Sequence, residues 1–286
     1  NPHSAAVWLH SCLEGVMQFN EVTDTGKQTG NNDGMAFDFD FNCRSCLLQY
    51  NFSRNNAGGF LLIMQSARDN IARYNLSIDD RDHLLYLVGR LEENNLVHNN
   101  TFHVREGKGY IIPRARIWNN IFLVEGRASM EEREGTGDFR NNAYHGYWRN
   151  LPGDSSPVRA DPMFANPTPS RERVTTFRNY MLRSGSPCLG KGAVLPEQGG
   201  RDLRGTPIPD RLPPDLGALQ SEASTDEDIV MIKNLPSSAF ALICLVLRLA
   251  ATACHAQPSW DVLSVCRIEV DPGGMRLDQP IVEPRA

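Results

Sequence analysis

The chain has 286 residues, a length that suits one large domain or two modest ones. Its 29 basic and 34 acidic residues give a net charge of −5, so no strong overall field favours nucleic acid or an anionic membrane. With 41% hydrophobic and 22% charged residues, the composition excludes a mostly disordered chain. Seven scattered cysteines are too few for a small disulfide scaffold.

A short pattern recurs along the first half of the chain and ends each time on asparagine. Of the 22 asparagines, 19 lie within residues 1–150. An apolar or alternating run precedes Asn20, Asn51, Asn75, Asn100 and Asn120, with gaps of 31, 24, 25 and 20 residues between them. Periods of about 20–50 residues indicate stacked repeats. The β-branched and aromatic members of each run indicate short strands rather than helices.

These repeats predict an all-β fold, a parallel β-helix. In such a solenoid each winding contributes about three short strands, which pair with their equivalents one winding away at about 4.8 Å. Stacked asparagine side chains at the turns then hydrogen-bond along a column, which explains their enrichment. An antiparallel β-sandwich with Asn-rich loops is the alternative.

Several segments also resemble a known superfamily. The resemblance rests on residues 32–40 (NDGMAFDFD), 49–60 (QYNFSRNNAGGF), 73–77 (RYNLS), 186–192 (SPCLGKG) and 214–219 (PDLGAL). These segments resemble the right-handed parallel β-helix repeat proteins, which include pectate lyases and several glycoside hydrolases. The resemblance covers about residues 5–220 and implies a right-handed solenoid, a polysaccharide partner and secretion. The last two segments resemble the closing coils of that group.

Composition divides the chain into two parts. Residues 1–220 are predicted to form the β-helix, N-terminally truncated, with upstream windings and any signal peptide expected to be missing. Residues 126–175 break the rhythm with Gly, Pro, Arg and Glu, and predict an insertion or irregular coils. Four prolines within 207–214 predict an extended closing segment.

Residues 221–286 differ in character. An acidic, polar linker is followed from residue 231 by a lysine, a short apolar core and small residues, the parts of a secretory signal peptide. The core is too short to span a bilayer, and Arg248 interrupts it. We interpret this tail as read-through into a neighbouring reading frame. A C-terminal helix that caps the solenoid is the alternative.

Cys43 and Cys46 form a single C-x-x-C pair. Without a second pair, this spacing does not favour a zinc site. On a strand, the two thiols are expected in the core.

Two aspartates alternate with phenylalanines in segment 37–41. Period-two alternation directs the phenylalanines inward and Asp38 and Asp40 outward. Same-face neighbours on a strand lie about 6.6–7 Å apart, at the lower edge of the roughly 6.5–9.5 Å separation of an inverting glycosidase pair. Alignment on the asparagine column places Trp8 in the core beside Phe39. It also gives the two aspartates apolar neighbours in the adjacent windings: Leu62, Met64, Val7 and Leu9.

These neighbours would exclude water from the two carboxyls and raise the pKa of at least one of them. Asp38 and Asp40 are therefore predicted to be catalytic, as acid and base. Solvated surface aspartates are the alternative. Met64, an apolar residue on the same face, is predicted to bind substrate.

A second constellation lies four residues beyond each asparagine, where Asp24, Asn55 and Asp79 share one column. Thr25, Asn56 and Asp80 form the column beside it. This oxygen-rich wall predicts a possible Ca²⁺ site with Asp24, Asp79 and Asp80 as ligands, because calcium takes six to eight oxygens. A stack of ordinary turns is the alternative, since Asp and Asn are favoured there. Asp79 is also a third candidate for acid–base chemistry.

Arg54 and Arg73 lie near these columns. A guanidinium rarely loses its proton, so each is predicted to clamp an acidic sugar, with Asn55 as a further substrate ligand. We expect a secreted polysaccharide-active protein, first of all a glycoside hydrolase with paired carboxylates. A uronate-directed lyase that uses Arg54 or Arg73, and a non-catalytic carbohydrate-binding surface protein, are the alternatives.

Overall fold

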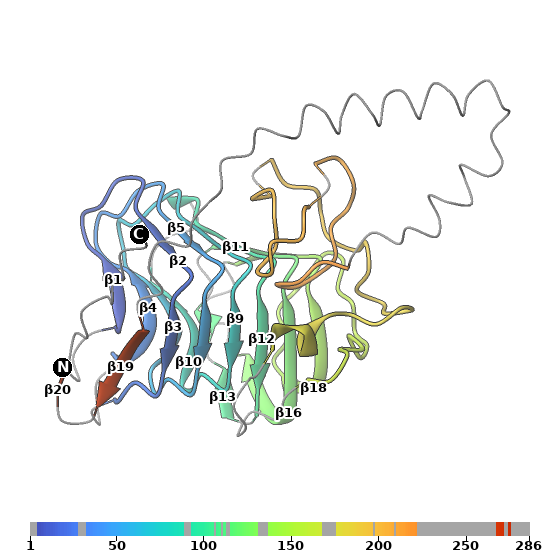
Figure 1. Ribbon diagram of the computed structural model, residues 1–286, viewed down its shortest axis with the longest axis horizontal. Coiled ribbons are helices and arrows are strands. Elements are labelled where there is room, and N and C mark those ends of the chain that lie inside the picture. Colours follow the sequence, from blue (N-terminus) through green and yellow to red (C-terminus); the bar gives the residue numbers. More distant parts are fainter. Residues whose placement is uncertain are drawn as a thin grey trace, which may run out of the picture. The chain divides into compact units, whose positions relative to one another are not determined.

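The computed structural model describes residues 5–27, 33–88, 93–105, 107–109, 111–112, 115–130, 137–167, 176–196, 198–208, 210–221, 267–271 and 274–275. Its regular structure is almost entirely β-strand, arranged in three sheets (Figure 1). One short 3₁₀ helix, η2 (Phe177–Tyr180), lies within the described part.

Each winding of the chain passes through the three sheets in turn. Sheet 1 contains β1 (Val7–Leu9), β4 (Met35–Phe39), β7 (Gly59–Ile63), β10 (His83–Leu87) and β14 (Ile111–Ile112). Sheet 2 contains β2 (Val16–Gln18), β5 (Leu47–Gln49), β8 (Ile71–Arg73), β11 (Leu96–His98), β15 (Arg116–Trp118) and β17 (Asp138–Arg140). Sheet 3 contains β3 (Glu21–Thr23), β6 (Phe52–Arg54), β9 (Leu76–Ile78), β12 (Thr101–Val104), β13 (Gly107–Gly109), β16 (Ile121–Met130), β18 (Ala143–Arg149), β19 (Arg267–Asp271) and β20 (Gly274–Met275).

Strands pair with their equivalents in the next winding. In sheet 3, for example, Val22 pairs with Ser53 and Ser53 with Ser77, in parallel. The successive windings lie side by side from the blue to the green part of the chain (Figure 1). The predicted parallel β-helix is therefore confirmed, and the antiparallel sandwich is wrong.

An asparagine column joins the windings at the turn between sheets 2 and 3. Asn51 Nδ2 donates to Asn75 Oδ1 at 2.9 Å, and Asn75 Nδ2 donates to Asn100 Oδ1 at 2.9 Å. The column begins at Asn20 and ends on Asp154 Oδ2. The amides also donate to backbone carbonyls, so that the buried polar groups are satisfied. The predicted superposition of Asn20, Asn51 and Asn75 is confirmed.

The residue before each of these asparagines has a left-handed backbone. Its φ is 58° at Phe19, 57° at Tyr50 and 50° at Tyr74, a region uncommon for bulky side chains. The rings of Phe19 and Tyr50 stack at 5.6 Å, and those of Tyr50 and Tyr74 at 6.3 Å. The repeated turn is thus supported on one side by stacked rings and on the other by the asparagine column.

Inside the coil, aromatic residues from successive windings fill the core. The ring centroids of Phe60 and Phe102 are 5.5 Å apart, and those of Phe102 and Phe122 are 5.0 Å apart. Cys43 and Cys46 are fully buried in the same core, as predicted.

The regular windings extend further than predicted. β16 runs through residue 130, and β18 pairs with it in parallel up to Arg149. A register shift between Leu123 and Arg127 absorbs the Gly-containing stretch as a local irregularity. The prediction of irregular chain from residue 126 onward is therefore wrong for these strands.

Asp154 and Val158 still pair in parallel with the preceding winding. The described residues between 159 and 221, the covering segment, pack along the side of the coil. Phe164 and Tyr180 join the outward Leu76 and Ile78 of sheet 3 in one apolar cluster. Figure 1 shows this segment in yellow to orange beside the later windings.

The same segment also reaches the turn between sheets 2 and 3. Gly217 N donates to Asn119 O at 2.9 Å, and Tyr50 Oη donates to Gly199 O at 3.0 Å. Residues 186–192 and 214–219 therefore lie against earlier windings, and the prediction that they are closing coils is wrong. Their prolines lack the N–H groups that a further winding would need.

Residues 222–266 lie outside the described part, and so do the predicted linker and the signal-peptide-like or capping segment. The backbone of β19 pairs in parallel with β3 and antiparallel with β20. The domain boundary at residue 220 stays a prediction.

Candidate active site

The outer face of sheet 1 carries a row of side chains, one from each winding. Strand register places Trp8 beside Asp38, Asp38 beside Leu62, and Leu62 beside Tyr86. Leu62 and Tyr86 belong to an apolar cluster on this face, together with Ala5, Met35, Met64 and Val88. Asp38 is therefore a carboxyl in an otherwise apolar surface.

A second row lies two residues further along the strands. Asp40 N donates to Leu9 O, and Met64 N donates to Phe39 O, so Met64 follows Asp40 in the next winding. The structure thus brings together Asp38, Asp40 and Met64, three of the predicted site residues.

The prediction for Trp8 is wrong. Val7 pairs with Phe37 and Trp8 with Asp38, one residue out of step with the sequence alignment. The corner between sheets 1 and 2 is one residue longer in the second winding, where it leads from Phe39 to Leu47, than in the first. Trp8 therefore points outward and is 49% exposed. The neighbours predicted for the two aspartates in the first winding, Val7 and Leu9, pair instead with Phe37 and Phe39.

Asp38 is an unusual carboxyl. It is only 7% exposed, and its Oδ1 has no hydrogen-bond partner in the described part of the chain. Burial raises its pKa to about 8, and the negative charges of Asp40 and Asp33 add to this effect. Asp38 is therefore protonated at neutral pH and can donate a proton.

Asp40 differs from Asp38 in its surroundings. It follows the end of β4 and is half-buried, and its Oδ1 accepts a hydrogen bond from Phe41 N at 2.7 Å. Among charged groups, Asp40 has the largest effect on the pKa of Asp38. The pair thus combines a proton donor and a charged carboxylate on one face.

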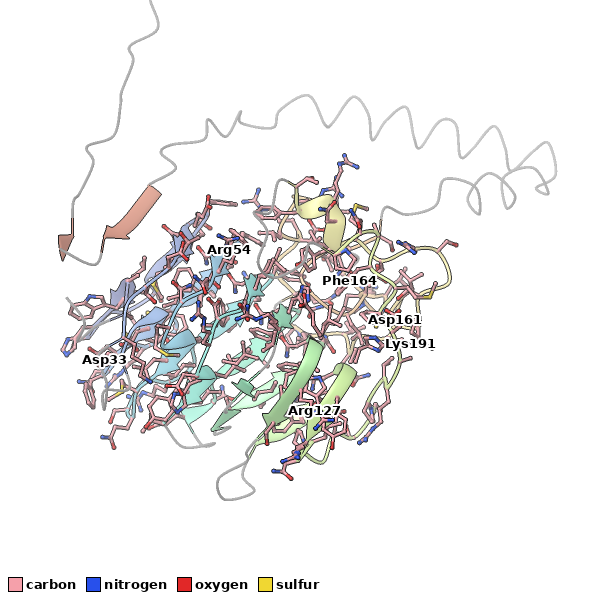
Figure 2. All side chains as sticks on the ribbon, turned by 90° about the horizontal axis from the view of Figure 1, so that it is seen from below. Asp33, Arg54, Arg127, Asp161, Phe164 and Lys191 are labelled. Carbon is pink, nitrogen blue, oxygen red and sulfur yellow. The ribbon has the colours of Figure 1, made fainter. Side chains whose placement is uncertain are left out.

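Sequence analysis missed Asp33. This residue precedes Gly34, whose φ of 89° turns the chain into β4. Its charge raises the pKa of Asp38, so it lies near the same site. The Asn-Asp-Gly turn before a strand was the available signal. Figure 2 shows Asp33 well apart from Arg54.

Polar residues near the start of β10 border this face. Lys27 Nζ forms an ion pair with Asp82, and His83 Nδ1 lies 3.2 Å from Asp82 Oδ2. The rings of His83 and Tyr86 are 4.6 Å apart. These groups could contact the hydroxyl groups of a ligand on sheet 1.

The remaining predicted residues lie on other faces. Arg73 is on sheet 2, 8% exposed, and its Nε donates to Gln49 Oε1 at 2.9 Å. A Cβ on Gly199, in the covering segment, would stand 2.9 Å from the guanidinium carbon. Arg73 is therefore buried beneath that segment, on another sheet than the carboxyl pair, and its substrate role stays a prediction.

Arg54 ends β6 of sheet 3, and Asn55 and Asp79 lie in the turns that follow β6 and β9. Asn55 Nδ2 donates to Asp24 Oδ1 in the preceding winding, and Arg105 Nη2 lies 3.4 Å from Asp79 Oδ2. These residues are not on the sheet that carries Asp38. The structure thus does not bring them to the carboxyl pair.

The predicted calcium wall is a turn stack. Asp80 is buried, and its carboxylate accepts hydrogen bonds from Asn56, Ser53 and Ser77. Burial raises its pKa to about 6. Among the residues that the structure describes, no three His, Cys, Asp or Glu side chains gather as a metal site. Asp24, Asp79 and Asp80 are thus not brought together as ligands.

The covering segment packs on sheets 2 and 3. Its apolar residues pack on sheet 3 and on Ile71 and Leu96 of sheet 2. Within the described residues, the apolar cluster outside sheet 1 includes none of them. The described part of the covering segment thus adds no residue to the apolar cluster beside Asp38.

Fold and site together define a parallel β-helix with an acidic site on the outer face of one sheet. No protein-family model matches the chain. The chain is similar to the lacto-N-biosidase of Bifidobacterium longum subsp. longum, with 28% identity over 251 residues. The match covers 77% of this chain but only 15% of that enzyme. In the described part of the chain, no helix is long and apolar enough to cross a membrane.

Proposed function

We propose that the chain is a glycoside hydrolase whose reacting groups are Asp38 and a second carboxylate on the outer face of sheet 1. The observation that carries this proposal is the buried Asp38, with its pKa of about 8 and its Oδ1 without a hydrogen-bond partner among the described residues. A carboxyl that stays protonated at neutral pH can protonate the departing glycosidic oxygen. A nearby carboxylate then activates water or attacks the sugar.

Asp40 is the carboxylate that we favour. It occupies the next outward position after Asp38, and such positions are about 6.6–7 Å apart. This separation falls at the lower edge of the range for inverting enzymes, so we expect hydrolysis with inversion at the anomeric carbon. Asp33 is the second candidate, because its charge also reaches Asp38.

The similarity to a lacto-N-biosidase supports a carbohydrate substrate. We infer that this chain takes an oligosaccharide or polysaccharide, first of all a glycoside of lacto-N-biose. An extracellular location, implied by the resemblance to secreted β-helix proteins, belongs to the same proposal. A uronate-directed lyase has less support, because Arg73 is buried and Arg54 lies on sheet 3.

The experiment compares the purified chain with single variants on p-nitrophenyl lacto-N-bioside and on a panel of glycans. A hydrolase releases p-nitrophenol and new reducing ends, whereas a lyase product absorbs in the ultraviolet and a binding protein gives neither signal. Asp38→Asn should lower kcat at least about 100-fold, the order that general acid catalysis contributes. Asp40→Asn should do the same, and Asp33→Asn tests the second candidate.

Asp69→Asn is the matched control. Asp69 is exposed, has a φ of 56° that asparagine tolerates, and accepts a hydrogen bond from Asn94. Its variant should keep full activity. Full activity in both Asp38→Asn and Asp40→Asn, with folding intact by circular dichroism, would contradict the assignment of the pair.

A further inference from the structure

Trp8 is the largest exposed apolar side chain beside the carboxyl pair. Its exposed fraction is 49%, and register makes it the direct neighbour of Asp38 one winding away, about 4.8 Å between strands. Its ring faces outward next to a carboxyl, so it can pack against the apolar face of a ligand that contacts this carboxyl.

Two further rings extend this surface. The His10 ring lies edge-on to Trp8 with centroids 6.2 Å apart, and the Phe41 ring lies 6.5 Å from His10. Phe41 is also the residue whose N–H holds Asp40. The aromatic row of Trp8, His10 and Phe41 therefore borders both carboxyls.

The row has the chemistry of a sugar platform. A pyranose ring has a face of C–H groups and a rim of hydroxyls, so that one side packs on an aromatic ring while the rim forms hydrogen bonds. Leu62 and Met64 continue the apolar floor on the other side of the aspartates. Lys27, Asp82 and His83 supply polar groups for the rim.

We propose that Trp8 is a substrate-binding residue that stacks against the C–H face of one sugar ring and so holds the glycosidic oxygen over Asp38. This inference deepens the proposed function and rests on it for the reacting group. The platform itself requires only that a sugar binds to this face.

The test uses two independent readouts on Trp8→Ala, Trp8→Phe and the control Val16→Ala. Val16 is also 49% exposed in the first winding, but it lies on sheet 2. The first readout is kcat and KM on p-nitrophenyl lacto-N-bioside. The second is a tryptophan fluorescence titration with lacto-N-biose, which needs no turnover, performed with each protein and with Asp38→Asn.

Trp8→Ala should raise KM and weaken sugar binding about 3- to 10-fold, the value expected for one aromatic stacking contact. Trp8→Phe should retain most of the affinity, and Val16→Ala should match the wild type. The fluorescence change should persist in Asp38→Asn and vanish in Trp8→Phe.

The outcomes separate the two proposals. A Trp8-dependent titration without any hydrolysis would overturn the proposed activity and leave the platform standing. Hydrolysis with an unchanged KM in Trp8→Ala would overturn the platform alone. An equal loss in Val16→Ala, or no Trp8-dependent signal with lacto-N-biose, would also overturn it.

Discussion

Replacement of Asp38 by asparagine should stabilise the protein while it removes activity. The pKa of this carboxyl is about 8 in the folded chain, against an ordinary value of 3.8. At pH values between 3.8 and 8, Asp38 is ionised in the unfolded chain but still protonated in the folded chain. The free energy of unfolding therefore falls as pH rises from 3.8 to 8, by about 1.4 kcal/mol per pH unit.

The magnitude follows from this slope. At pH 7 the raised pKa of Asp38 lowers the free energy of unfolding by about 4 kcal/mol, whereas near pH 4 its effect is close to zero. Asparagine has a similar shape and no charge, and the Oδ1 that it retains has no hydrogen bond to lose within the described part. Asp38→Asn should thus be more stable than the wild type by a margin that grows with pH, up to about 4 kcal/mol at pH 7.

The assay is guanidinium denaturation at pH 4, 5, 6 and 7, followed by circular dichroism. The exposed control Asp69→Asn should follow the pH dependence of the wild type, while the stability of Asp38→Asn relative to the wild type should increase with pH. A difference between Asp38→Asn and wild type that stays constant from pH 4 to pH 7 would refute the raised pKa. Stability that rises as activity falls is the pattern of a residue kept for function rather than folding.

Three further predictions concern the scaffold. Asn75→Ala should lower the free energy of unfolding by about 3–5 kcal/mol, because it leaves the buried hydrogen-bond partners of Asn75 on both sides of the column unpaired. Asn20→Ala, at the partly exposed end of the column, should lower it by about 1 kcal/mol or less. Urea denaturation measures both changes. Gly59→Ala should lower the free energy of unfolding by about 3 kcal/mol or more, or prevent folding, because the φ of Gly59 is 126° and a Cβ would stand 1.6 Å from His83 O. Gly153 has open space around it, so the control Gly153→Ala should match the wild type in thermal unfolding. Burial lowers the pKa of His98 to about 3, below its ordinary 6.5, so the contribution of His98 to stability falls as pH drops below 6.5. The stability of His98→Gln relative to the wild type, measured by denaturation, should therefore increase as pH drops from 6.5 to 5, and a constant difference would contradict the lowered pKa.

The candidate site was only partly readable from the sequence. Asp38, Asp40 and Met64 could be grouped because alternation along one strand and the repeat length set their face. Arg73 and Asp79 were grouped with them wrongly, because distance along the chain does not tell which of the three sheets carries a residue. Asp33 was missed because its turn position shows no periodicity.

Local residue chemistry was sufficient for the architecture of this chain. Each short β-forming run ends on a buried asparagine, whose side-chain amide finds hydrogen-bond partners when equivalent turns stack. The repeat therefore indicated both the coil and the column through Asn51 and Asn75. Folding in three dimensions decided the site. One extra residue at the corner before Leu47 turned Trp8 outward, and the covering segment packed on sheets 2 and 3. Such register and coverage depend on contacts between residues far apart in the chain, which local patterns do not encode.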